Sequence, residues 1–246
     1  MPDSLLTVAM QHRVGGVSLD VNFTLTQPWT VLFGPPGSGK TTVLRAIAGF
    51  VRPDGGRIHC RSEAWFDVQA KVFVPPHQRA ARSAGQIARL FPHMNVTRNI
   101  MYGQGWTSKP QDAREISEQV MDSFGLRQFA DRMPQELSGG ESQRASVARA
   151  LVSAITFIGL EEKPLLLLDE PLGGLDVALR DQMVAELKRW TEQWKIPVLS
   201  VTHALSEAFL LEAEVVKITD GKVVKQGPAT EVLAEERSQL LRQLQG

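Results

Sequence analysis

A run of residues near the start of the chain has the types and spacing needed to hold a row of phosphates. Residues 34–41 read Gly-Pro-Pro-Gly-Ser-Gly-Lys-Thr, which fits the pattern G-x-x-x-x-G-K-[ST] in full. Glycines allow the backbone to wrap around phosphates with successive N–H groups pointing inward. We expect Lys40 to bridge the β- and γ-phosphates and the Thr41 hydroxyl to bind magnesium. The predicted nucleotide-binding residues here are Gly34, Pro35, Pro36, Gly37, Ser38, Gly39, Lys40, Thr41 and Thr42.

Two carboxylates follow an entirely apolar segment in the second half of the chain. Leu165–Leu168 is apolar at every position, which is typical of a strand buried on both faces of a parallel sheet. Ligands of open α/β sheets collect at the carboxyl ends of such strands. We therefore expect Asp169 to bind the magnesium ion and Glu170 to act as general base toward water. The alternative is that both acids merely cap a solvated loop, and the phosphate loop in the same chain disfavours it.

A histidine follows a second apolar segment. Val198–Val201 is followed by Thr202 and His203, so the same geometry predicts that His203 lies near the γ-phosphate. There it would sense the phosphate or position the attacking water. A lone histidine more often has a structural role, and the motifs around His203 reverse that preference.

The segment Leu137–Gln143 reads Leu-Ser-Gly-Gly-Glu-Ser-Gln and predicts a helix start with exposed N–H groups. Ser138 and Glu141 have the spacing of a capping box, in which each side chain bonds the other residue's backbone. A capped helix alone would not explain Gly139 and Gly140, which are poor helix formers without packing value. We expect their backbone to approach a phosphate closely.

These motifs together resemble the ATP-binding cassette (ABC) ATPases, and the resemblance covers nearly the whole chain. In that family the Leu-Ser-Gly-Gly segment closes over the ATP that is bound by a second copy. The resemblance thus implies a homodimer in which Ser138, Gly139 and Gly140 contact the partner's nucleotide. It also implies that Asp176 lies in a loop facing across the dimer. Gln86 resembles the glutamine that links magnesium and catalysis to the membrane partner.

The residues after Gln86 resemble importers, most closely those for molybdate, tungstate or sulfate. They read Leu-Phe-Pro-His-Met over residues 90–94, and Trp65-Phe66-Asp67 and Pro75-Pro76-His77 add to this likeness. The resemblance implies an ATP-hydrolysing subunit, peripheral at the cytoplasmic face of the membrane. Its partners would be permease subunits, docked near Gln86–Met94, and indirectly a periplasmic or extracellular solute-binding protein. The alternatives are another importer, an exporter, or a soluble ABC ATPase acting on nucleic acid or ribosomes.

Composition favours the transport alternatives. Lys and Arg number 27, and Asp and Glu number 27, so the formal net charge is zero. This balance argues against a broad electrostatic grip on nucleic acid, and we expect no such partner. Cys60 is the only cysteine, as is common in a reducing compartment. The longest apolar stretch, 151–160, is too short to span a bilayer, so membrane association would require a partner.

The elements that must position these residues follow an α/β pattern. The first thirty residues alternate as half-buried strands do, helical periodicity dominates 98–151, and strand, helix and strand follow Pro164. We expect helices at 41–50, 141–152 and 177–194 and from about residue 230. The family implies a P-loop NTPase (RecA-like) core with an N-terminal antiparallel β subdomain and an inserted α-helical subdomain. One nucleotide-binding domain would span 1–246, with its core at about 1–86 and 153–246 and the helical part at about 87–152.

Three segments depart from the family pattern. Residues 81–84 read Ala-Arg-Ser-Ala where an apolar strand is usual, so we expect a weakly held strand and a mobile Gln86 loop. Residues 11–17 contain no Tyr, Phe or Trp, so adenine would lie against Val17, Arg13 or His12 and base selectivity would be modest. The link at 152–163 is long, and its apolar residues would extend a helix or pack on the surface. Those residues are Ile155, Phe157, Ile158 and Leu160.

Overall fold

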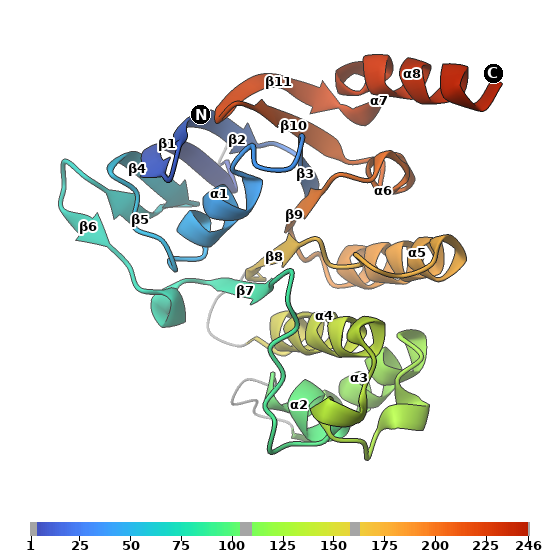
Figure 1. Ribbon diagram of the computed structural model, residues 1–246. Helices are drawn as coiled ribbons and strands as arrows, with labels where there is room; N and C mark the ends of the chain where they lie inside the picture. Colours follow the sequence, from blue (N-terminus) through green and yellow to red (C-terminus); the bar gives the residue numbers. More distant parts are fainter. Residues whose placement is uncertain (1–3, 104–109, 158–162, 246) are drawn as a thin grey trace. The chain divides into compact units, whose positions relative to one another are not determined.

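A computed structural model of the protein describes residues 4–103, 110–157 and 163–245 (Figure 1). The chain forms two compact units, the first made of Met1–Arg79 with Leu199–Gly246 and the second of Ala80–Val198. Within the described ranges, no helix combines the length and the apolar character that crossing a membrane requires. The domain division at about residues 87 and 152 stays a prediction.

The first unit is built on a mixed β-sheet. Its described strands follow the order β6-β5-β4-β1-β2-β11-β10-β3-β9. β1 pairs antiparallel with β2 and β4, whereas β3 pairs in parallel with β10. The expected N-terminal antiparallel part is thus present beside parallel strands. The strands are β1 (Leu6–Val14), β2 (Val17–Leu25), β3 (Trp29–Phe33), β4 (Gly55–Cys60), β5 (Glu63–Asp67), β6 (Val72–Phe73), β9 (Val198–Thr202), β10 (Glu214–Thr219) and β11 (Lys222–Pro228).

Side-chain patterning explains these strands. In β2 every second residue from Leu19 to Leu25 is buried while its neighbours face outward, which confirms the predicted half-buried strand. β3 is buried at every position, as its apolar sequence requires for a strand inside the sheet. This buried strand ends at Phe33, so the phosphate loop leaves the sheet directly from its core.

The helices of the first unit differ in two places from those predicted. Helix α1 spans Lys40–Ile47 and ends before residue 50, because Gly49 turns the chain with φ at +85°. The single helix expected from about residue 230 is two helices, interrupted at Leu233. Besides α1, the helical elements of this unit are η1 (Pro76–Gln78), α6 (Leu205–Leu210), α7 (Ala229–Val232) and α8 (Ala234–Gln245).

The second unit places helices against a parallel strand pair. β7 pairs in parallel with β8, and α4 contacts both strands. Helices α2 and α3 pack on α4, as Figure 1 shows. The predicted helical segment is therefore present. The elements are β7 (Ala81–Ala84), β8 (Leu165–Asp169), α2 (Val96–Tyr102), α3 (Pro110–Ser123), η2 (Arg127–Phe129), η3 (Pro134–Glu136), α4 (Gly139–Ile155) and α5 (Val177–Gln193).

The strand before Gln86 is more regular than its sequence suggested. β7 and β8 pair in uninterrupted register, so the expectation of a weakly held strand is wrong for these four residues. Arg82 explains part of the difference, because its Nε donates to Ser153 Oγ at 2.7 Å and its guanidinium lies 4.6 Å from the ring centroid of Phe157. The cation–π contact replaces apolar burial. Pairing stops before Gly85 and Gln86, and the mobility of their loop stays a prediction.

Helix α4 begins at the two glycines, as its capping box predicted, and extends further than predicted at its C-terminal end. It begins at Gly139 and continues to Ile155, so Ile155 prolongs the helix as one of the two expectations had it. Phe157 lies beyond the helix, half-buried and beneath the Arg82 guanidinium. Ile158 and Leu160 lie outside the described residues.

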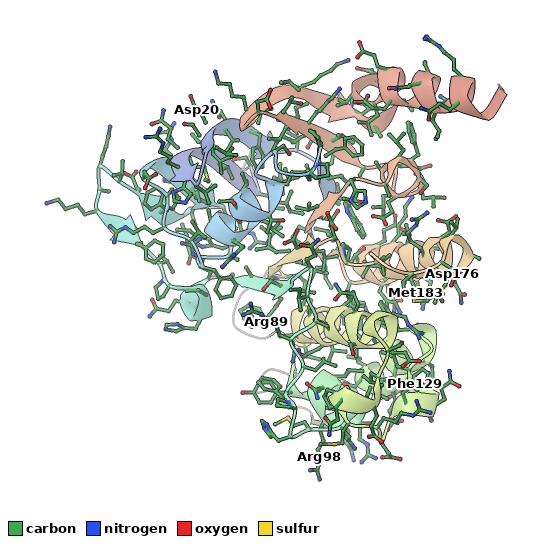
Figure 2. The ribbon with its side chains drawn as sticks, in the orientation of Figure 1. Asp20, Arg89, Arg98, Phe129, Asp176 and Met183 are labelled. Atoms are coloured by element: carbon green, nitrogen blue, oxygen red, sulfur yellow. The ribbon has the colours of Figure 1, made fainter. Side chains whose placement is uncertain are left out.

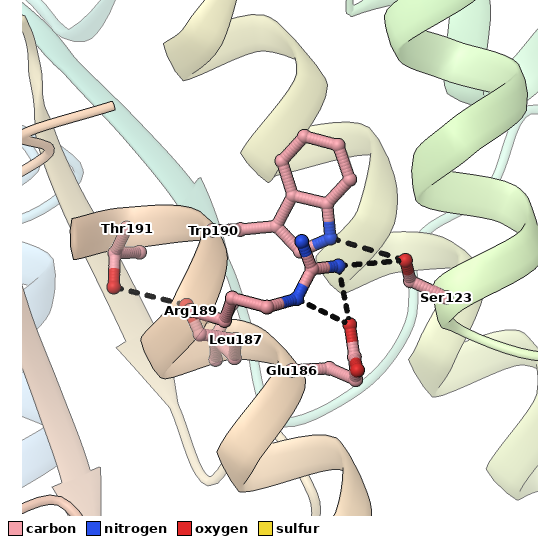
Figure 3. Close-up of polar contacts among 6 residues, drawn as sticks. All are labelled: Ser123, Glu186, Leu187, Arg189, Trp190 and Thr191. Carbon is pink, nitrogen blue, oxygen red and sulfur yellow. Dashed lines mark hydrogen bonds and ion pairs between the residues drawn. The ribbon is translucent and has the colours of Figure 1, made fainter. Parts of the chain in front are cut away.

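Polar contacts tie the end of α3 to α5 (Figure 3). Ser123 Oγ accepts hydrogen bonds from Trp190 Nε1 at 3.2 Å and from Arg189 Nη2 at 3.1 Å. Arg189 Nη2 also donates to Glu186 Oε2 at 2.6 Å. Trp190 is itself buried. The hydroxyl of Ser123 therefore joins α3 to α5, the helix that follows β8.

Candidate functional site

The phosphate loop connects β3 to α1, and its glycines are needed for two different reasons. A Cβ on Gly34 would lie 2.0 Å from Ile218 O, and one on Gly39 would lie 2.2 Å from Leu19 Cδ2. A Cβ at either position would overlap these neighbouring atoms, so both positions favour glycine. Gly37, at φ +81°, meets nothing within 4 Å and opens onto free space. The loop is tight against the sheet and has room for a ligand beside Gly37.

Lys40 is buried at the first turn of α1. Its Nζ donates to the carbonyl oxygens of Gly34 and Pro35, each at 2.8 Å. No side chain caps the start of α1 among the described residues. A lysine and a helix N-terminus without a side-chain cap give this loop a positive end, which fits the charge of a nucleotide's phosphates.

His203 belongs to the same unit as the phosphate loop. It follows β9, which is the neighbour of β3 in the sheet, and its side chain is exposed. Buried Ser200 accepts a hydrogen bond from Trp29 Nε1 at 2.9 Å, and Thr202 Oγ1 accepts one from the Ala204 N–H at 3.0 Å. These contacts fix the end of the strand from which His203 emerges. Its part in catalysis stays a prediction.

The acidic residues lie in the second unit, at the end of β8. All four leucines of β8 are fully buried, and Asp169 is only 4% exposed. Glu170 has a φ of +46°, a left-handed conformation that is uncommon for a residue with a side chain. Gln86 Nε2 donates to Glu170 Oε2 at 3.0 Å, so the structure brings two predicted catalytic residues together.

The oxygen donors predicted for magnesium suit that ion. Thr41 offers a hydroxyl, Asp169 a carboxylate and Gln86 an amide oxygen, and magnesium prefers such hard oxygen ligands. Over the described parts of the chain, no three His, Cys, Asp or Glu side chains gather into a metal cage.

The start of α4 has the predicted capping box. Ser138 Oγ accepts from the Glu141 N–H at 3.3 Å, and Glu141 Oε2 accepts from the Ser138 N–H at 2.7 Å. A Cβ on Gly139 would meet nothing within 4 Å, whereas one on Gly140 would lie 2.8 Å from Leu175 Cδ2. The expectation that neither glycine has packing value is therefore wrong for Gly140. Gly139 alone opens onto free space.

Asp176, labelled in Figure 2, is the N-cap of α5. Its Oδ1 accepts a hydrogen bond from the Leu179 N–H at 3.0 Å. Asp176 thereby has a structural role that the resemblance did not indicate, because an aspartate at a helix start satisfies a backbone donor. Its predicted role across a dimer stays a prediction.

The segment after Gln86 is organised by a buried asparagine that sequence reasoning missed. Asn99 Nδ2 donates to the carbonyls of Phe91 and Met94, and its Oδ1 accepts from the Phe91 N–H at 2.7 Å. Phe91 packs against Tyr102 with ring centroids 4.4 Å apart and ring planes tilted by 57°, and Tyr102 is 60% exposed. The Arg149 guanidinium lies 5.1 Å from the Phe91 ring centroid. An aromatic surface thus stands on a rigid polar base, and the only signal was an asparagine inside a helical pattern.

The hairpin segment 11–17, predicted to contact the base, has no Phe, Tyr or Trp and holds a histidine close to a carboxylate. His12 Nδ1 lies 3.2 Å from Asp54 Oδ2, which also accepts from the Arg13 N–H at 2.7 Å. Which of His12, Arg13 and Val17 contacts adenine stays a prediction.

Comparison with known proteins decides the family. The sequence model of the ABC transporter family matches residues 18–173. The chain belongs to the ABC transporter family. A solved structure of cbiO1 from Clostridium perfringens, described as part of the ABC transporter complex cbiONQ, covers 95% of this ABC protein and is itself covered to 92%. Its TM-score is 0.75 at 23% identity, which supports the P-loop ABC fold.

Relatives of this ABC protein include molybdenum import ATP-binding proteins. ModC from Rhizobium etli is 39% identical over 229 residues, which cover 93% of this chain and 62% of that protein. ModC 1 from Azotobacter vinelandii is 38% identical over 238 residues, covering 95% of this chain and 63% of that protein. The chain thus spans 62% to 63% of the length of these relatives. The resemblance to molybdate-type ABC proteins, stated from the motifs, is confirmed.

Proposed function

We propose that this chain binds and hydrolyses ATP as the ATP-binding subunit of an importer for molybdate or a related oxyanion. Membership of the ABC family and similarity to ModC proteins support the transport role. The observation that carries the hydrolytic role is the hydrogen bond between Gln86 and Glu170 at the end of a buried strand. This bond joins the carboxylate of Glu170, whose backbone is left-handed, to the side-chain amide of Gln86. The two groups could bind the same water molecule.

The phosphate loop binds the triphosphate in this proposal. Backbone N–H groups of the non-proline residues between 34 and 42 would face the phosphates, and Gly37 provides the space. Lys40 would transfer its hydrogen bonds from the loop carbonyls to the β- and γ-phosphates, because the anionic oxygens are the stronger acceptors. Binding of ATP therefore replaces contacts that the loop makes with itself.

The Thr41 hydroxyl and Asp169 would hold magnesium, with Gln86 as a further oxygen ligand. The hard oxygen donors of these side chains support this assignment. The ion would neutralise charge on the phosphate oxygens. Asp169 is well suited to this task because a buried carboxylate gains from a nearby cation.

Glu170 orients and deprotonates the attacking water. Its backbone conformation is fixed at the end of β8, and Gln86 holds one carboxylate oxygen. The carboxylate would accept the proton from water. His203 contacts the γ-phosphate or the same water and reports whether the phosphate is still attached.

The site is completed by a second copy of the chain. The first turn of α4, with its capped Ser138 and its open Gly139, offers backbone N–H groups to the partner's γ-phosphate. Gly140 completes this turn, and Asp176 lies in the loop that faces across the dimer. Two ATP molecules would then bridge the two copies, and loss of the γ-phosphate would let them separate.

The dimer would bind permease subunits at the cytoplasmic face of the membrane. The Phe91–Tyr102 aromatic surface is the proposed contact, because exposed aromatic side chains on a rigid base favour protein association. The oxyanion would reach the permease through a solute-binding protein. The balance of positive and negative charges gives no support to binding of nucleic acid.

Replacing Glu170 by glutamine tests the hydrolytic role. Glu170→Gln keeps size and hydrogen bonding but removes the base, so turnover should fall by about 10²–10⁴-fold. ATP affinity, measured by titration of a fluorescent analogue, should remain. Near-normal turnover would remove Glu170 from the base role. For the transport role, molybdate should stimulate ATP hydrolysis by the complex reconstituted with its permease and solute-binding protein, and stimulation by an unrelated solute alone would contradict it.

A further inference from the structure

The buried glutamine Gln143 connects the start of α4 to the turn just before Gln86, the residue that donates a hydrogen bond to Glu170. It lies on the first turns of the helix and is only 5% exposed. Its Nε2 donates to the carbonyl oxygen of Gly85 at 3.0 Å. A buried amide is costly without a hydrogen bond, so this contact holds both Gln143 and the carbonyl that it reaches.

Gly85 stands where regular pairing has ended. The β7–β8 register runs to Ala84, so Gly85 is the first residue beyond the ladder. Packing does little at this point, because a Cβ on Gly85 would find only Ile87 O, at 3.9 Å. The hydrogen bond from Gln143 therefore fixes the turn more than packing does.

The next residue along the chain is Gln86, whose side chain bonds Glu170. Two hydrogen bonds of 3.0 Å each thus connect α4 to the carboxylate: Gln143 to Gly85, and Gln86 to Glu170. A single peptide unit connects Gly85 to Gln86, so displacement of Gly85 would displace Gln86. All of these residues belong to the second unit.

We propose that Gln143 is a positioning residue that holds the Gly85–Gln86 turn where Gln86 can reach Glu170. The inference rests on the proposed function and adds a consequence to it. The helix whose N-terminus would face the partner's nucleotide is tied to the catalytic base of its own chain. Movement of α4 is thereby transmitted to the base through a side-chain amide and one peptide unit.

The size of the effect follows from hydrogen-bond geometry. A shift of about 1 Å would stretch the Gln86–Glu170 contact beyond hydrogen-bonding distance. Misplacement of a positioning group by about 1 Å can cost on the order of 10²-fold in rate. We therefore expect loss of the Gln143 amide to lower kcat by about 10–100-fold while KM for ATP changes by less than about threefold.

Gln143→Met is the test variant, since methionine keeps the length and cannot donate. It is compared in the full chain with Gln119→Met, which removes an exposed amide bonded to Glu115 on α3. Thr156→Val, which removes a buried hydroxyl from the end of α4, controls for loss of stability. Lower kcat in Gln143→Met alone supports the proposal. If Gln143→Met does not fold, Gln143→Leu, which also lacks the donor and places no charge in this buried position, replaces it.

A double-mutant cycle separates positioning from a general structural role. If Gln143 acts through Gln86, the variant Q143M/Q86M should have the same kcat as Gln86→Met within about twofold. Multiplied effects would overturn the proposal, because two independent contributions would then be present. Wild-type kcat in Gln143→Met, with an active parent protein, would overturn this inference and leave the proposed function intact. A parent protein without ATPase activity would overturn both.

Discussion

Arg79 gives the most quantitative prediction for the fold that carries the phosphate loop. Its guanidinium is buried among backbone carbonyls and lies 5.5–5.6 Å from the ring centroids of Phe73 and Trp65. Burial lowers the pKa of Arg79 to about 10, so the group remains charged at neutral pH. It donates to Ala46 O at 2.8 Å, Ile47 O at 2.6 Å, Trp65 O at 3.1 Å and Val74 O at 2.8 Å.

Arg79→Met would leave the Ile47 and Val74 carbonyls without their donor, whereas Ala46 O and Trp65 O would still accept from the Gly49 and Val74 N–H groups. Ile47 ends α1, so its carbonyl has no partner within the helix. Each buried acceptor left unsatisfied costs about 1–3 kcal/mol, and the contacts with two aromatic rings are lost as well. Partial hydration and removal of the buried charge offset part of this loss. We expect the free energy of unfolding to fall by about 3–5 kcal/mol in total.

Urea unfolding followed by tryptophan fluorescence measures the change. For a chain of this length, the same loss would lower Tm by roughly 6–20 °C. Arg52→Met is the matched control, because Arg52 also stacks on Phe73, at 5.4 Å, but is exposed. Its loss should cost no more than about 1 kcal/mol. Equal losses in the two variants, or a loss below about 1 kcal/mol in Arg79→Met, would refute the reasoning.

Two further predictions concern specificity and coupling. GTP should compete with ATP within about tenfold in affinity. The reason is that residues 11–17 offer no Phe, Tyr or Trp on which the base could stack, a contact worth about 1–3 kcal/mol. Discrimination above a hundredfold in competition binding would contradict this. Phe91→Ala should abolish stimulation of ATPase activity by the permease and leave the activity of the isolated chain within about twofold, since Phe91 packs against the exposed Tyr102 side chain. Unchanged stimulation in proteoliposomes would remove this surface from docking.

The elements that carry regular patterns were predicted closely from the sequence. The four leucines before Asp169 fixed a buried strand, and the spacing of Ser138 and Glu141 fixed the start of α4. Both patterns depend on contacts between near neighbours or on burial of a continuous run, which local sequence reports well. The end of α1 was less well placed, because Gly49 and the distant Arg79 decide where that helix stops.

Contacts between distant segments escaped the sequence. The hydrogen bond from Gln143 to Gly85 spans 58 positions, and no local pattern marks a glutamine as buried rather than exposed. Asn99 likewise reads as an ordinary helical residue, although it organises the loop before α2. Ala81–Ala84 was judged too polar for a firm strand, because the Arg82 contact with Phe157 could not be foreseen.

The central claim is that each catalytic centre combines the phosphate loop of one copy with the first turn of α4 from another. Two inactive variants test it. Lys40→Ala disables the phosphate loop, and Gly139→Asp places a carboxylate where the partner's phosphate would lie. The second substitution is compatible with folding, because Gly139 faces open space and an acidic residue suits a helix N-terminus.

The measurement is the ATPase rate of an equimolar mixture of the two variants, each inactive alone. If the first turn of α4 serves the partner's nucleotide, a mixed dimer contains one intact centre, made from the phosphate loop of Gly139→Asp and the helix start of Lys40→Ala. The mixture should then recover activity, up to roughly a quarter of the wild-type rate when half of all dimers are mixed and hold one centre of two. A mixture as inactive as its components, beside an active wild-type protein, would contradict the shared site.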